Sequence, residues 1–376
     1  MQPKAARNIS IEALRLVAVA GIAIFHTFQW AFQAACAGMP EYAPFAAFPY
    51  SGVLGFINLL GCWANEVFFM ISGYFLIASA ARAWNDGTTW ASQIQRTVQR
   101  LGKVVLPTAF YCLVALAWST TVSPIPDVSL VTHYWYTLGL EFIWVYAATV
   151  CMAPLFGLAK NRLSKRSYTA AVITIGILAF VANGYLAAMS SANGGEFSWL
   201  QKIMSAATYV VAFLIGGLLR DVTDAMDSGR VRALGSRSLI AVLAIAIVLE
   251  STLSFTGSLT AMATLSYKST SLISFALAAA SLLFAATRRS ASGNPRTAGV
   301  IVTLSNATLG FYVMQSLTSS LWRPIFNAML ANILVAQSSP ASICIVTGTV
   351  ISIVFALMLL VVDAVRNRIL RSLKQQ

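Results

Sequence analysis

Long apolar runs, separated by short polar stretches, follow one another along almost the whole chain. Each run approaches the ~20 residues that a helix needs to cross the hydrocarbon core of a bilayer. The pattern predicts ten spans: 11–32, 53–78, 104–122, 134–158, 168–189, 203–219, 239–255, 270–287, 299–321 and 341–365. Because no long polar segment remains for a soluble domain, we expect an all-α, polytopic integral membrane protein whose residues 1–376 form a single membrane-embedded domain.

Composition and charge agree with this interpretation. The chain is 58% hydrophobic and 10% charged, with a mean hydropathy of +0.75, whereas ordinary soluble domains are about 25% charged. Of the 25 Lys and Arg residues, only Lys202, Lys268 and Arg323 fall in loops on the side opposite to both termini, and Arg15 lies within a span. Because translocated loops exclude Lys and Arg, the pattern predicts that both termini are cytoplasmic.

The net charge of +13 is therefore explained by membrane topology. The expected location is a cell membrane, in particular a bacterial cytoplasmic membrane, and basic loops attract anionic headgroups, so membrane lipids are expected partners. A nucleic-acid partner is not expected, because binding one would call for a soluble basic face with interleaved aromatic residues.

Ionisable residues inside the predicted spans are functional candidates, because each costs about 2.5–3.5 kcal/mol there. They are Arg15, His26, Glu66, Glu141 and Glu250. Arg15 falls in the cytoplasmic third of the first span and His26 in its outer third. Eleven residues of helix bring their side chains to within about 20° of one face and separate them by about 16 Å. Glu66 falls in mid-span, and Glu141 about two turns inside the outer end of the fourth span.

The first two candidates each have more than one interpretation. His26 could be a core histidine bonded to a neighbouring helix, or the general base that deprotonates a hydroxyl. Arg15 could pair with Glu12 one turn earlier, anchor the helix at the interface, or bind a phosphate or carbonyl group at the cytoplasmic entrance.

A basic stripe at helical spacing, formed by Arg96, Arg100 and Lys103, precedes the third span. It is either ordinary cytoplasmic flanking charge or a docking site for a phosphate-rich cofactor. The chain has no nucleophile elbow, no Walker phosphate loop and no His or Cys cluster at zinc spacing, so no metal is expected. Any chemistry must come from the scattered membrane residues.

Several of these residues resemble the motifs of the type-3 membrane acyltransferases. Residues 11–16, Ile-Glu-Ala-Leu-Arg-Leu, followed by His26 with ten residues between Arg15 and the histidine, resemble the motif that opens the first helix of that family. Residues 66–76, Glu-Val-Phe-Phe-Met-Ile-Ser-Gly-Tyr-Phe-Leu, are similar to its Phe-Phe-x-x-Ser-Gly-aromatic-Leu signature. Within this signature, Ser72 and Gly73 are expected to allow close helix packing.

Two further matches follow in family order. The basic stripe and Pro107 resemble the entry to the third helix, and residues 133–136 with Tyr146 and Pro154 resemble the aromatic helix after it. The chain departs from the family pattern at Glu12 and Glu66, where Asp or Asn is commoner, and at Lys103, near a usual Arg. These departures keep charge or polarity.

The resemblance implies transfer of an acyl group, usually acetyl from acetyl-CoA, to a sugar hydroxyl of a surface polysaccharide or a lipid-linked glycan. Arg15 and the basic stripe would hold the donor on the cytoplasmic side, and His26 would act as base. Glu66 or Glu141 would orient His26 or hold the acceptor, and a covalent acyl-enzyme on Ser72 is a weaker alternative. The motifs leave the acceptor, the acyl chain length and the oligomeric state open.

A proton-coupled transporter or a glycolipid flippase is the main rival, because ten spans with buried Arg, His and Glu also describe such proteins. Two features count against it. The sequence shows no paired broken helices in matching halves, and the candidate residues concentrate in the first four spans.

Overall fold

The computed structural model describes residues 7–126, 128, 140–192, 198–266, 271–288, 294–336 and 340–373. Over these residues the chain forms helices α1 to α14 and one short 3₁₀ helix, η1, and no strand. The predicted all-α class is therefore confirmed.

Eight helices of the described chain are long and apolar enough to cross a membrane. They are α1 (Ile9–Cys36), α3 (Tyr50–Asn85), α4 (Trp90–Thr121), α5 (Glu141–Arg162), α6 (Lys165–Ala192), α7 (Ser198–Ala225), α8 (Ser228–Phe255) and α14 (Pro340–Leu373). These helices make the chain a multi-pass membrane protein.

The remaining two predicted spans differ from simple crossing helices. The ninth is a pair, α11 (Pro295–Ser305) and α12 (Thr308–Leu317), bent by 41°. The other is α10 (Leu272–Thr287), whose 16 residues fall short of a full crossing. Helix α10 contacts α3, α7 and α8, so protein rather than lipid surrounds much of it. This surrounding explains how a short apolar helix is accommodated.

Two helices extend well past the predicted spans. Helix α3 continues to Asn85 and α4 begins at Trp90, so the polar region around the basic stripe is helical. The Thr89 side chain accepts a hydrogen bond from the Ser92 backbone N–H at 3.4 Å and caps α4. Hydropathy detects only the apolar part of a helix that crosses the hydrocarbon core, and polar residues can continue the helix beyond it.

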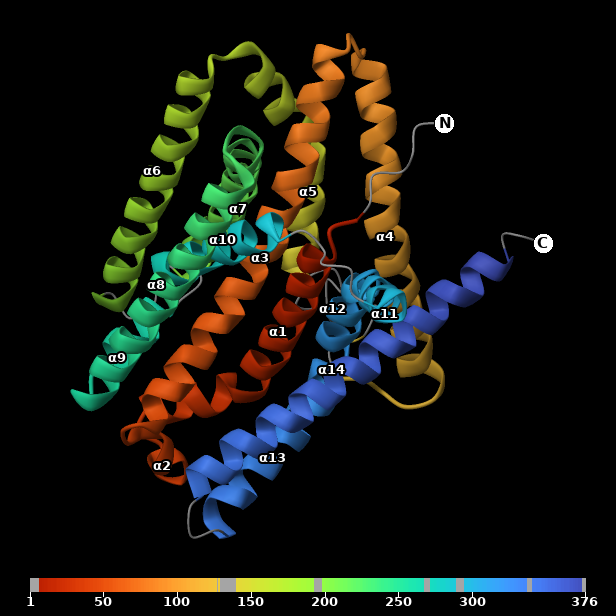
Figure 1. Cartoon of the computed structure of the whole chain (residues 1–376). Helices are drawn as coiled ribbons and strands as arrows, with labels where there is room; N and C mark the ends of the chain where they lie inside the picture. The colour runs from red at the N-terminus through yellow and green to blue at the C-terminus, as the bar shows by residue number, and fades with distance from the viewer. Residues whose placement is uncertain are drawn as a thin grey trace.

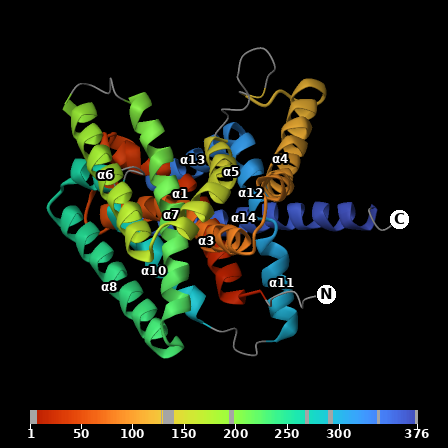
Figure 2. The same cartoon turned by 90° about the horizontal axis from the view of Figure 1, so that it is seen from above.

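Helix α3 lies at the centre of the bundle (Figures 1 and 2). It contacts α1, α5, α7, α8 and α10. In its apolar stretch 78% of the residues are buried, against 17% in α8. Figure 2 shows α6 and α8 on one flank and α4 with the end of α14 on the other. These outer helices expose large apolar side chains such as Leu106, Ile240 and Val354, as expected of a surface that faces lipid.

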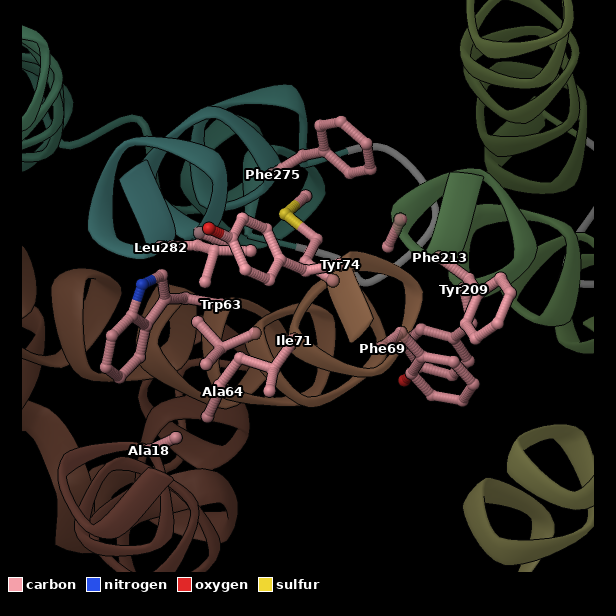
Figure 3. Close-up of a cluster of buried hydrophobic side chains, with 14 of the residues drawn as sticks. Ala18, Trp63, Ala64, Phe69, Ile71, Tyr74, Tyr209, Phe213, Phe275 and Leu282 are labelled. Carbon is pink, nitrogen blue, oxygen red and sulfur yellow. The ribbon is translucent and has the colours of Figure 1, made fainter. Parts of the chain in front are cut away.

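The central packing depends on aromatic contacts and on small residues. Figure 3 shows the rings of Phe69 on α3 and Tyr209 on α7 stacked, with centroids 4.7 Å apart. Next to them, a Cβ at Gly73 would collide with the Phe213 carbonyl oxygen of α7, and one at Gly216 would collide with the Met70 carbonyl oxygen of α3. The expectation that Gly73 allows close helix packing is therefore confirmed.

Three short elements lie together where α1 ends and α3 begins (Figure 1). They are η1 (Pro40–Tyr42), α2 (Ala43–Ala46) and α13 (Ser319–Ala336). The predicted spans leave residues 322–340 without a helix, so α13 is a difference from the prediction. It carries an arginine and a proline in its first two turns, and it packs on α1, η1 and α14. The remaining short helix is α9 (Leu259–Leu265).

Candidate active site

The start of α1 is hydrogen-bonded to α10 and, through Glu12, to α11. The Asn8 side chain accepts hydrogen bonds from the Ser10 and Ile11 backbone N–H groups and donates one to the Ala286 carbonyl oxygen of α10 at 3.3 Å. One turn later Arg15 Nη1 lies 2.9 Å from Glu12 Oε2, so the predicted ion pair is present.

A third group joins this ion pair from α11. The Ser305 hydroxyl donates a hydrogen bond to the same Glu12 oxygen. Glu12 is 7% exposed, whereas the Arg15 side chain is 26% exposed. The guanidinium is therefore held at one edge by a buried carboxylate while the rest of it stays accessible.

His26 lies on the same helix, nearer its outer end. Its Nδ1 lies 3.3 Å from Gln29 Oε1, one turn later, and 3.2 Å from Nη2 of Arg323 on α13. The Phe25 ring lies 4.9 Å from the imidazole, which is half-buried. The interpretation of His26 as a histidine bonded to a neighbouring helix is correct. This hydrogen bonding is also compatible with a role of His26 as general base, because the partner at one ring nitrogen decides which of the two nitrogens carries the proton.

Glu66 is buried between α3 and α10. Its side chain is 1% exposed, and neither carboxyl oxygen has a hydrogen bond of standard geometry to any described residue. The Ser274 hydroxyl of α10 lies near this carboxyl group. Glu66 thus makes no hydrogen bond to His26, and the neighbours that orient the imidazole are Gln29 and Arg323.

Glu141 lies at the beginning of α5, not inside a span. Leu140 precedes it as the N-cap residue, and Glu141 is exposed in the first helical turn. The predicted depth of two turns is therefore wrong. An acidic residue in the first turn complements the positive end of the helix dipole, and the Glu141 charge also acts on Tyr312 of α12.

The basic stripe divides into one inward and two outward cations. Arg96 and Lys103 are exposed, whereas Arg100 is half-buried. Arg100 Nη2 donates to the Ser79 hydroxyl of α3 at 3.3 Å. Arg96 and Tyr146 of α5 are its electrostatic neighbours. Its Nη1 is buried without a hydrogen-bond partner among the described residues. A guanidinium with one donor unused can still bind an oxyanion.

Ser72 connects α3 to α5. Its hydroxyl oxygen lies 2.9 Å from the Phe68 carbonyl oxygen and 3.1 Å from the Tyr146 hydroxyl. Neither partner is a base, and a nucleophilic serine needs a base within hydrogen-bond reach. Within the described chain, Ser72 is therefore a packing and hydrogen-bonding residue.

The sequence analysis missed Arg323 and Gln29 as neighbours of His26. Arg323 is one of three basic residues on the predicted outer side, which could have singled it out. Gln29 is three residues after His26, a spacing that places two side chains on one helix face. His133 lies outside the described residues. No group of three or more His, Cys, Asp or Glu residues in the described part could hold a metal ion.

The fold and these polar groups define a class of protein, a polytopic helical membrane protein with ionisable side chains inside the bundle. Comparison with known families gives a match to an acyltransferase domain over residues 8–360. The chain belongs to the type-3 acyltransferase family, and it is a membrane acyltransferase. Comparisons with curated proteins and with solved structures gave no match.

Proposed function

We propose that this protein transfers an acetyl group from acetyl-CoA, bound at the cytoplasmic side, to a sugar hydroxyl of a cell-surface polysaccharide or lipid-linked glycan. The observation that carries the proposal is the half-buried imidazole of His26, hydrogen-bonded at Nδ1, on the same helix as the accessible Arg15. Their separation of about 16 Å along α1 leaves room for the long arm of the donor.

The donor site is proposed at the two groups of basic residues toward the cytoplasmic side. Arg15 has accessible N–H groups beside its ion pair, and Arg100 has a buried N–H group without a hydrogen-bond partner among the described residues. Both suit the phosphate oxygens of coenzyme A, which accept charge-assisted hydrogen bonds from guanidinium groups. Arg96 and Lys103 add exposed positive charge that attracts the same anion from the cytosol.

The proposed reaction is general-base catalysis. His26 takes the proton of the acceptor hydroxyl while the hydroxyl oxygen attacks the thioester carbonyl carbon. The new C–O ester bond forms, the C–S bond breaks, and the departing thiolate takes the proton from His26. The acceptor reaches His26 from the outer side or from the outer leaflet. The enzyme works in a cell membrane, with membrane lipids as neighbours and the bacterial cytoplasmic membrane as the expected location.

Transport is the second candidate, and one observation favours it. Helices α11 and α12 form a broken span, bent by 41°, and broken helices line the binding sites of many transporters. Such transporters usually carry broken helices in both of two related halves. Over the described residues this is the one bent pair, so we place acyl transfer first.

The test uses purified protein, labelled acetyl-CoA and a panel of glycan acceptors, with water as an additional acceptor. We expect label transfer or thioester hydrolysis that His26→Ala lowers by about 10²–10⁴-fold, the usual contribution of a general base. Thermal unfolding in detergent checks that the variant is folded.

A matched control is Arg296→Ala, which removes an exposed charge far in sequence from the candidate residues. Transfer at the normal rate by the His26 variant would remove this residue from the base role. Failure of the wild-type protein to act on any acceptor, water included, would favour transport instead.

A further inference from the structure

Arg323 lies in an unusual place for a basic residue. It belongs to a loop region that the charge pattern places outside, where Lys and Arg are scarce. It is half-buried on α13, and its Nη2 lies 3.2 Å from Nδ1 of His26. A cation that is unfavourable on this side, and that contacts the proposed base, is expected to have a function.

The charge of Arg323 has no partner of opposite sign within the described chain. Its other contact is with the Trp322 ring, 5.6 Å from the guanidinium carbon. Its Nε is buried and has no hydrogen-bond partner among the described residues. Partly buried cations without an anion are costly, so this guanidinium suits a negative charge that the substrate supplies.

From this geometry we propose that Arg323 is a catalytic residue that binds the acyl carbonyl oxygen as negative charge develops on it. The inference rests on the acyl transfer proposed above. The attacked carbonyl must lie beside both the base and the oxyanion donors, and His26 and Arg323 are already in contact. The planar guanidinium offers several N–H donors to one oxygen, and such donors stabilise the tetrahedral intermediate.

The step balances without another reactant. As the acceptor oxygen bonds to the carbonyl carbon, the C=O π electrons move to the oxygen beside Arg323, and the hydroxyl proton moves to His26. The electrons return when the C–S bond breaks, and the thiolate takes the proton.

The second neighbour of His26 supports this role. Arg323 can only donate a hydrogen bond, so its contact with Nδ1 requires a proton on Nε2 and leaves Nε2 unable to act as base. The side-chain carbonyl oxygen of Gln29 can only accept a hydrogen bond, so it favours a proton on Nδ1 and an unprotonated Nε2. The hydrogen bond from Arg323 and the hydrogen bond to Gln29 therefore compete for the same atom, Nδ1 of His26. When Arg323 turns to the carbonyl oxygen of the substrate, Gln29 holds His26 in the tautomer that can act as a base.

The test compares Arg323→Ala and Arg323→Lys with the wild-type protein, using acetyl-CoA hydrolysis by water and transfer to the best glycan acceptor. For Arg323→Ala we expect kcat to fall by about 10²–10³-fold, as for loss of an oxyanion donor. The KM values for acetyl-CoA and for the acceptor stay within about threefold, because the lost interaction exists only in the transition state. Arg323→Lys keeps part of kcat. Guanidinium ion added at millimolar concentration should restore part of the kcat of Arg323→Ala, a rescue that a purely structural role of Arg323 would not explain.

The outcomes separate this inference from the function on which it rests. Arg296→Ala serves as the control and is expected to keep the wild-type rate. If the wild-type protein is active and Arg323→Ala keeps its kcat, or changes only the KM of the acceptor, the oxyanion role is wrong while acyl transfer stands. If the wild-type protein transfers nothing and hydrolyses nothing, acyl transfer itself is wrong and the inference is overturned with it.

Discussion

Two residues of α1 show how the setting of a side chain limits its chemistry. Arg15 is held by Glu12, which in turn accepts a hydrogen bond from Ser305. His26 is held by Gln29 and Arg323. The arginine has an anion beside it and the histidine has a cation, so the surroundings of the two side chains carry opposite charge.

Replacing Arg15 tests the donor side of this proposal. Arg15→Gln removes the charge but can still donate a hydrogen bond to Glu12, so the start of α1 should stay folded. We expect the KM for acetyl-CoA to rise about tenfold or more, because a charge-assisted hydrogen bond contributes roughly 1.5–3 kcal/mol.

Arg162→Gln is the matched control, since this residue is exposed at the end of α5. The measurement is the dependence of the initial rate on acetyl-CoA concentration. Equal effects of the two variants would remove Arg15 from the donor site.

Among the elements, α3 and α7 form the closest helix pair of the core described above. Gly73 of α3 and Gly216 of α7 each lie against a backbone carbonyl group of the other helix. On the same part of α3, the Ser72 hydroxyl donates a hydrogen bond to the Tyr146 hydroxyl of α5. The family signature at residues 66–76 therefore has a structural meaning, which is a helix surface small enough to let neighbouring backbones approach.

Gly73→Ala tests this packing. The new Cβ would collide with a backbone carbonyl group, which cannot move as a flexible side chain does, and overpacking of a well-packed core costs typically 1–3 kcal/mol. We expect a lower thermal unfolding temperature in detergent and a smaller monodisperse fraction.

Gly102→Ala on α4 is the control, because a Cβ there meets no atom within 4 Å. In a helix, Gly to Ala is favourable by up to about 1 kcal/mol, so this variant should unfold at the wild-type temperature or above it. A Gly73→Ala protein as stable as the wild type would show that α3 and α7 can separate without cost.

Over the whole molecule, the helices form a bundle whose buried centre is α3 and whose outer helices expose apolar side chains. The predicted topology places both termini in the cytoplasm. It also places the loop that joins α3 to α4 inside and the segment after α1 outside.

Cysteine labelling tests this topology. Met39 and Asp86 are exposed in these two segments, and of the five native cysteines Cys36 and Cys151 are the two that are not buried. With Cys36 and Cys151 changed to serine, we expect Met39→Cys to react with a membrane-impermeant maleimide in intact cells. Asp86→Cys should react only after permeabilisation, and the reverse order would invert the topology.

The sequence by itself determined the class, the order of the eight long apolar helices, and the family, because these properties depend on local hydropathy and on motifs within single helices. It also offered the ion pair with Glu12 as one of three interpretations of Arg15, because the two residues lie one turn apart. Hydropathy could not locate the end of α3 or the start of α4, because polar helical turns carry no lipid-facing signal. It placed Glu141 too deep for the opposite reason, because it counted the largely apolar residues 134–140 into the span, whereas α5 begins at Glu141.

Only the tertiary structure decided which residues surround His26. Arg323 is 297 residues away in sequence, and no local pattern connects it to α1. Glu66, which the motif suggested as a neighbour, faces α10 instead. Contacts between distant helices depend on how the whole bundle packs, and a half-buried cation on α13 becomes meaningful only when the fold brings it to the imidazole.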